Sequence, residues 1–493
     1  MVTKIIQSLI FAFLVINVTL ANNISVTNVL LTGQDVGSDY IMVEFDISWE
    51  NSWRVSTGPS NWDAAWVFIK YRKNAQGPWE HCTLNYSDGT GSGDGHTEPA
   101  NTNIASSEDN GSGGAYGVFI YRDSDMAQAD VSYTDVKLRW NYGDDGLDDS
   151  DVAEVCVYAI EMVYVPQGSF EIGCGLTANG CFFTYGDGTS SYEITSENEV
   201  PVSTTNGDLY HYVGTRANIP ANFPKGYDAY YCMKYEITQE QYVSFLNKLD
   251  DTQASLRDNE VISGTGLYRN EIIGNPGGYS TTNEYVAANY LCWRDLAAYL
   301  DWAALRPMTE LEYEKAARGD LAAVRYEYAW GTTFIAEEDY TLSNEGDSDE
   351  GIATNFVHGG GNALVSATAG VISGPVRVGI FAAYDSYINR EVAGSGWYGA
   401  MELSGNVTEY VINVSTANGI AFTGEHGDGE LTSAGASDVT NWPNSTTDGF
   451  GLRGGHHGVI ATYARVSDRQ FVLASYETTG YYFTGGRGVR TAP

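Results

Sequence analysis

The sequence predicts a β-rich α+β protein, in which an N-terminal β-sandwich precedes a loop-rich domain with a few short helices. Glycine occurs 56 times and tyrosine 35 times among 493 residues, which is typical of short strands joined by many loops. Alternating apolar runs fill the first third of the chain, and the helix-start signals that we find all follow residue 236. This length exceeds one hydrophobic core, so we expect two or three domains.

Residues 1–21 resemble a secretory signal peptide. Lys4 supplies a basic start, an apolar run follows, and small residues precede a cleavage point after Ala21. No cysteine stands directly after that point, which argues against a lipid anchor, and no later stretch reaches the roughly 20 apolar residues of a spanning helix. We therefore expect a secreted or periplasmic protein that is not inserted in a membrane.

Residues 22–160 form the predicted sandwich. Seven apolar runs are separated by clusters of Gly, Asp, Asn and Ser, a pattern that fits two packed antiparallel sheets. Trp49, Trp66 and Trp140 lie within these runs. Each could lie in the core or face a ligand, and because large aromatic residues dominate protein cores, we expect all three in the core.

Two helix starts stand out in the rest of the chain. Thr238 is followed three residues later by Gln241, and Thr309 is followed by Glu312, so each pair has the spacing of a capping box. Apolar residues at helical spacing predict a third helix across residues 293–305. The segments between these helices are predicted to be loops and short strands.

Charge and cysteine content restrict the partners and the chemistry. A formal net charge of −37 argues against nucleic acid and anionic membranes, since both bind basic surfaces. The six cysteines are even in number, and Cys174 and Cys181 could close a small loop in an oxidising compartment. The absence of any Cys-x-x-Cys argues against a redox dithiol or a zinc ribbon.

The stretch ELSGNVTEY sets Glu402 and Glu409 around the pair Gly405 and Asn406. Gly-Asn favours a tight turn, and such a turn can direct two carboxylates and nearby carbonyls at one point, as calcium requires. Spacing alone leaves two interpretations open. The stretch is either a polar turn between strands or a cation site.

Seven pieces, in order along residues 161–493, resemble the formylglycine-generating enzyme, or sulfatase-modifying-factor, family. The pieces are MVYVPQGSFEIG, YYCMKYEITQEQYVSFLN, LRPMTELEYEKAARG, YGAMELSGNVTEYV, LRGGHHG, ARVSDR and GGRGVR. The resemblance implies a loop-rich relative of the C-type-lectin-like fold. It does not extend to residues 22–160.

The resemblance also implies metal ligands. Carried over position by position, a calcium site would use the side chains of Glu402 and Glu409 and the carbonyls of Gly405 and Val407. A second family site would use Asn344 and the carbonyl of Glu345, but its remaining acid falls near Thr368 in this sequence. We therefore expect calcium at the first loop, whereas the second loop lacks the family's remaining acid.

The residues that would perform the family's oxidation of a substrate cysteine are replaced. Family enzymes hold copper with two cysteines after the RGG segment, since Cu(I) prefers thiolates. Those places fall near Val459 and Ala464, and no cysteine follows Cys292. His456 replaces the family serine after RGG, and Thr408 replaces the aromatic residue of the GN-x-W-E motif. No copper is expected.

A ligand pocket is predicted from side chains near the C-terminus. His456 and His457 either line a pocket or serve catalysis, and because adjacent residues on a strand point to opposite faces, we do not expect them to share one ion. Five arginines follow residue 452; most should bind buried acids and carbonyls, and Arg469 is expected to reach the surface. Tyr476 and Tyr481 complete the predicted pocket.

The leading hypothesis is a secreted, non-catalytic binding or structural protein, stabilised by calcium. Its ligand would be a protein, a peptide or a glycan, bound by the loops at residues 456–463 and 471–483, whose aromatic, small and polar residues suit recognition. One alternative is a metal-dependent oxidase of the same family with a different metal or other thiolates. Another is a subunit of an extracellular fibre or surface layer, assembled through a sandwich edge.

Overall fold

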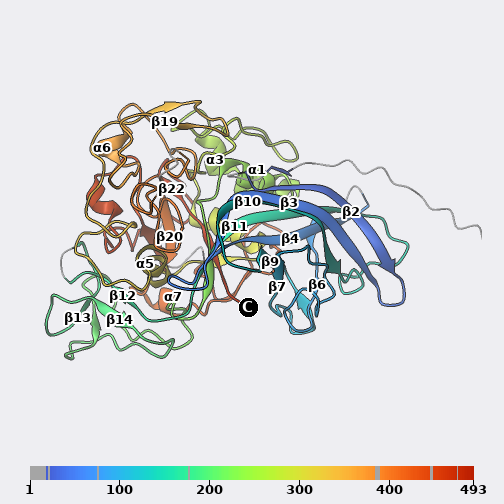
Figure 1. The fold of residues 1–493 in the computed structure, drawn as a ribbon, viewed down its shortest axis with the longest axis horizontal. Coiled ribbons are helices and arrows are strands. Elements are labelled where there is room, and N and C mark those ends of the chain that lie inside the picture. Colours follow the sequence, from blue (N-terminus) through green and yellow to red (C-terminus); the bar gives the residue numbers. More distant parts are fainter. Residues whose placement is uncertain are drawn as a thin grey trace, which may run out of the picture.

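The computed structural model describes residues 18–19, 23–74, 77–175, 178–383, 389–444, 448–474 and 476–493. The predicted signal peptide therefore lies outside the described residues, apart from strand β1, Val18–Thr19. The chain is rich in strands, as predicted, and most of its helices are short (Figure 1). Within the described residues, no helix has both the length and the apolar character needed to span a membrane.

The N-terminal part is the expected β-sandwich. Its first sheet has the order β1-β2-β3-β10-β6-β8, and long antiparallel strands β2, β3 and β10 dominate it (Figure 1). Side chains of both sheets share one core, which contains Trp49 and Trp140, and Trp66 is equally buried. After β1 the strands of this sheet are β2 Ser25–Asp35, β3 Tyr40–Arg54, β6 Leu84–Asn85, β8 Gly114–Ala115 and β10 Met126–Trp140.

The second sheet joins the two predicted domains. Strand β11, Ala153–Val165, crosses residue 160 and pairs with sandwich strand β4 on one side and with β16 of the second part on the other. The sheet order is β17-β23-β16-β11-β4-β9-β7, with β5 paired to β4. Its other strands are β4 Asp63–Lys73, β5 Glu80–His81, β7 Thr102–Ala105, β9 Val118–Arg122, β16 Tyr230–Met233, β17 Arg306–Pro307 and β23 Gly488–Thr491.

Direct contacts hold the two parts together. Trp66 donates its indole N–H to the carbonyl of Ala303 at 2.9 Å, and Asn61 Nδ2 donates to the carbonyl of Tyr398 at 2.8 Å. Buried side chains from both parts also form one continuous core. The sandwich is therefore packed into the second part and is not attached as a separate module.

The three predicted helices begin where the sequence placed them. Thr238 and Thr309 each accept the N–H three residues on, and both capping boxes are complete. The helix predicted across residues 293–305 ends at Trp302, three residues early. Ala304 just beyond it has a positive φ of 53°, which does not continue a right-handed helix. The helices are α1 Gln239–Leu246, α2 Asp251–Arg257, α3 Asn259–Ser263, α4 Trp293–Trp302, α5 Glu310–Arg318, α6 Ser366–Ala369 and α7 Ala417–Ile420.

Short sheets support the loops of the second part. The three-stranded sheet β21-β20-β22 connects the loops of the C-terminal region. Its central strand β20 packs against α5. The strands are β12 Phe170–Ile172, β13 Phe183–Thr184, β14 Tyr192–Ile194, β15 Leu209–Tyr210, β18 Thr341–Ser343, β19 Gly351–Thr354, β20 Thr408–Ile412, β21 Phe450–Arg453 and β22 Thr484–Gly485.

Candidate functional site

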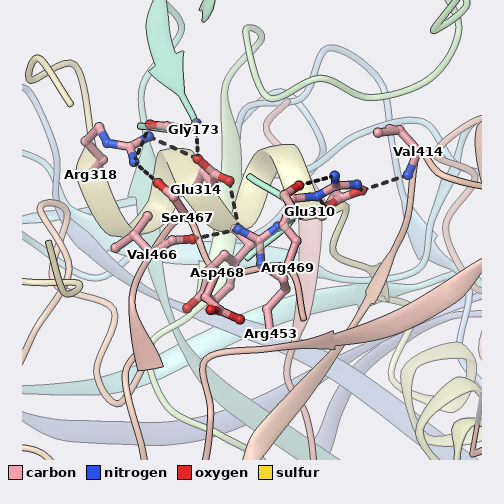
Figure 2. Close-up of polar contacts among 12 residues, drawn as sticks. Gly173, Glu310, Glu314, Arg318, Val414, Arg453, Val466, Ser467, Asp468 and Arg469 are labelled. Atoms are coloured by element: carbon pink, nitrogen blue, oxygen red, sulfur yellow. Dashed lines mark hydrogen bonds and ion pairs between the residues drawn. The ribbon is translucent and has the colours of Figure 1, made fainter. Parts of the chain in front are cut away.

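Helix α5 carries two carboxylates into a buried network of ion pairs (Figure 2). Glu310 accepts from Arg469 Nε at 2.6 Å and from Arg453 Nη1 at 2.9 Å. Glu314 accepts from Arg453 Nη2 at 2.7 Å and from Arg318 Nη1 at 3.1 Å. All five side chains are fully buried. Because a buried charge is tolerated only when it is paired, this network fixes the C-terminal loops to α5.

The network corrects one prediction and confirms another. Arg469 does not reach the surface: its guanidinium is bound to Glu310 and lies 3.9 Å from the centre of the Phe182 ring. The prediction that Arg469 lines an open pocket is therefore wrong, because the buried Glu310 needs it as a counter-charge. Arg487 and Arg490 are likewise buried and paired with carboxylates, so the structural interpretation of these arginines is confirmed.

The loop ELSGNVTEY is buried where β20 begins. Arg487 donates from Nε and Nη2 to the two oxygens of Glu409, each at 2.7 Å. Glu236, which the sequence did not single out, accepts two N–H groups of the same loop, from Asn406 Nδ2 at 2.5 Å and from the backbone next to it at 3.1 Å. Glu402 is 4 % exposed. The three buried carboxyl groups of Glu236, Glu402 and Glu409 thus lie near the guanidinium of Arg487, with that of Arg377 also near Glu402, and burial raises the pKa of each.

A cation would favour the ionised form of these carboxyl groups. Glu402 Oε1 accepts one backbone N–H at 2.9 Å, whereas Oε2 is buried without a hydrogen-bond partner among the described residues. Burial, opposed by Arg487 and reinforced by Glu409, raises the pKa of Glu402 to about 7. Both oxygens of Glu409 are occupied by Arg487. Among the predicted ligands, Glu402 is therefore the carboxylate whose second oxygen is available to bind a cation. The carbonyls of Gly405 and Val407 are the other predicted ligands.

The loop of the second predicted calcium site is organised differently. Asn344 Nδ2 donates to Asp349 at 2.8 Å, and Thr368, at the place of the missing acid, donates its hydroxyl to a backbone carbonyl at 2.7 Å. The buried acid of this loop is Glu350, which pairs with the guanidinium of Arg269. This loop therefore needs no metal ion to balance its buried charge.

Seven side chains from three segments gather into a cluster that we call the aromatic surface: Tyr268, His456, His457, Tyr476, Tyr481, Tyr482 and Phe483. Tyr268 stacks on Tyr482 with ring centroids 4.1 Å apart, and Tyr481 stacks on Phe483 at 5.4 Å. Tyr268 and Tyr481 are each 38 % exposed. The structure thus brings four of the five predicted pocket residues together and adds Tyr268, Tyr482 and Phe483.

The two histidines are the buried members of this cluster. They follow β21 in a segment that is not a strand, and their ring centroids are 5.5 Å apart, so the premise that they point to opposite faces is wrong. Both are buried, and burial lowers the pKa of His456 to about 3 and that of His457 to about 4. Both imidazoles are therefore neutral near pH 7 and act as packing surfaces for Tyr482 and Phe483.

A hollow of about 600 Å³ adjoins the aromatic surface through Tyr268. Its lining mixes exposed apolar groups with charged and amide side chains, and it includes Glu345 from the second predicted calcium loop. The lining residues are Gly266, Leu267, Tyr268, Arg269, Glu271, Asn283, Glu345, Gly346 and Ser373. Exposed rings beside a polar hollow can bind a ligand by stacking and by hydrogen bonds.

The positions of the family's copper cysteines carry no metal-binding side chain. Val459 is part-buried, and Ala464 ends the short 3₁₀ helix η2, Ala461–Ala464. The other thiols are elsewhere: Cys232 lies in β16, and Cys292 caps α4 and donates to Asp295 at 3.0 Å. Cys174 and Cys181 are both buried.

The ligand-type side chains that do converge were not predicted from the sequence. Among the residues that the structure describes, one group of three lies within 4.8 Å: Asp301, Asp428 and Asp438. Within the described residues, Cys232, Cys292 and His456 do not form such a group. Asp301 accepts the backbone N–H groups of the two other aspartates, each at 3.1 Å, so it fixes a loop on α4. No local pattern marks these contacts, since the partners are 127 and 137 positions apart in the sequence.

The fold and site together define a β-rich protein with a loop-rich second part, which is held by buried ion pairs and presents aromatic side chains. The family model described as sulfatase-modifying factor enzyme 1-like domain matches residues 150–491. The chain therefore belongs to this family, as its motifs indicated. Comparison with curated proteins gives no match. Among solved structures, the chain is similar to Treponema denticola variable protein 1, with 15 % identity, a TM-score of 0.33, and coverage of 68 % of this chain and 96 % of that one.

Proposed function

We propose that the protein is an exported, non-catalytic binding protein that uses a sulfatase-modifying-factor-like scaffold to present the aromatic surface. The observation that carries the proposal is the aromatic surface itself, in which Tyr268 and Tyr481 are exposed and Tyr268 also lines a hollow. Tyrosines offer large contact area at little entropic cost. The signal-like residues 1–21 support export.

The replaced copper positions support a non-catalytic role. Val459 and Ala464 stand where family enzymes place thiolates, and neither side chain can bind Cu(I). The buried histidines nearby are neutral packing groups. A scaffold that keeps its ion pairs while it lacks these ligands is suited to recognition.

Calcium is the proposed stabiliser. Glu402 Oε2 and the carbonyls of Gly405 and Val407 would hold the ion, and its charge would offset the buried carboxylates. The ion would thereby stiffen the loop from which β20 starts. In this proposal calcium is structural, and ligand binding occurs at the aromatic surface.

Arrays of immobilised peptides and glycans test the binding function. The wild type should bind a subset of spots, and Tyr481→Ala should weaken that binding. Tyr212→Ala is the matched control, because Tyr212 is 63 % exposed in a different ring cluster, with Phe183 and Tyr210. The proposal would be contradicted if Tyr481→Ala bound every array ligand as strongly as the wild type does. So would repeated conversion of a peptide cysteine to an aldehyde by protein supplied with copper or iron and oxygen.

A further inference from the structure

The hollow beside the aromatic surface has an excess of negative charge. Arg269 is the one cationic side chain among the described residues that line it. Its guanidinium donates to both oxygens of Glu350, through Nη1 at 3.2 Å and through Nη2, and Nη1 also donates to the carbonyl of Pro375 at 2.6 Å. This pair is neutral overall. Glu271 and Glu345 remain as the uncompensated charges of the lining.

These two carboxylates are available to a ligand. Glu345 is exposed and Glu271 is half-buried, and within the described part of the chain neither side chain forms an ion pair or a hydrogen bond. Glu350 differs, because it is fully buried and also accepts backbone N–H groups from Gly346 at 2.7 Å and Arg377 at 2.8 Å. The fixed acid thus holds the loop, while the two free acids face solvent.

An exposed aromatic ring completes the hollow. Tyr268 lines it and is held by stacking on Tyr482. Asn289, which is fully buried, donates through Nδ2 to the carbonyls of both residues, at 3.0 and 3.1 Å. The ring is therefore fixed in place before any ligand arrives. A tyrosine face near carboxylates favours a cation, through the ring quadrupole and through Coulomb attraction.

We propose that the hollow binds a lysine or arginine side chain of a protein ligand. The inference rests on the proposed binding function and specifies its ligand as a basic protein segment. The net charge of −37 acts in the same direction, because it attracts basic partners and repels acidic ones over long range. Leu267, 53 % exposed on the same lining, offers apolar contact to the stem of such a side chain.

Calorimetric titration of the full chain with three probes tests the inference: tetralysine, tetraglutamate and the neutral sugar maltotetraose. Salt of about 0.15 M limits the Debye length to about 8 Å, so that contacts at the hollow outweigh the general attraction of the acidic surface. Tetralysine should bind. Glu271→Gln/Glu345→Gln should weaken it about tenfold, from the loss of two partly exposed charge contacts.

Asp123→Asn/Glu193→Gln is the matched control. Both residues are exposed and lie on other elements, and the double variant changes the net charge by the same amount. It should change tetralysine affinity by less than about twofold, since neither residue lines the hollow and salt screens exposed charges beyond about 8 Å. Equal losses in the two double variants, or equal binding of the three probes, would overturn the inference.

The array experiment separates this inference from the proposed function. Array ligands that depend on Tyr481 but not on Glu271 and Glu345 would overturn the cationic hollow alone and leave the binding function in place. The absence of any Tyr481-dependent ligand would overturn the proposed function itself. Array ligands that depend on all three residues and are rich in lysine or arginine would support both.

Discussion

Replacing Glu310 with glutamine should destabilise the protein strongly. The amide has nearly the same size, so packing is kept, but the negative charge between two buried guanidinium groups is lost. Arg453 would retain Glu314 at 2.7 Å, whereas Arg469 would retain neutral partners, the carbonyl of Gly180 at 2.9 Å and the hydroxyl of Ser415 at 2.7 Å. Arg469 is thus the uncompensated charge, and breaking one buried pair costs about 3–5 kcal/mol.

Urea unfolding followed by tryptophan fluorescence measures this loss. Glu154→Gln is the matched control, because Glu154 lies 2.5 Å from Arg72 but the two side chains are 39 % and 29 % exposed. An exposed pair contributes less than about 1 kcal/mol. The midpoint should fall far more for Glu310→Gln, with an unchanged slope. Equal losses in the two variants would refute the claim that burial makes the network important.

The stability difference between the wild type and Glu310→Gln should depend on pH because of these ion pairs. Burial opposes ionisation of Glu310, but Arg469 and Arg453 outweigh it and lower its pKa. A lowered pKa stabilises the fold above the unfolded value of about 4.3, and this stabilisation is lost as the pH falls through the folded pKa. The gap between the wild type and Glu310→Gln should therefore be full near pH 7 and shrink in acid.

Three further predictions concern metal, architecture and pH. EGTA should lower the melting temperature of the wild type but not of Glu402→Gln, which lacks the charge that binds calcium; a wild type that melts identically with and without EGTA would contradict the site. A fragment of residues 151–493 should be insoluble, because β11 loses its β4 partner; a soluble fragment with one cooperative transition would show the sandwich to be dispensable. Burial raises the pKa of Asp301 to about 7, so stability should fall as the pH rises from about 4 to 7. The urea midpoint of Asp301→Asn should therefore depend less steeply on pH over this range than that of the wild type.

The sequence alone identified the local structure and the family. Thr238 and Thr309 marked the two helix starts correctly, since a capping box depends on residues three apart. Trp49 and Trp140 were correctly placed in the core from their apolar runs. The ordered motifs indicated the family that the model for residues 150–491 shows.

Only the tertiary structure decided which charges are paired and which residues meet. Arg469 looked like a surface residue because its partner Glu310 is 159 positions away, and Glu236 gave no local sign that it would reach the loop at Glu402. Tyr268 joined the aromatic surface from a segment more than 180 residues before His456. The physical reason is the same in each case: a short motif fixes its own turn or helix, whereas burial and pairing depend on long-range packing that no local pattern records.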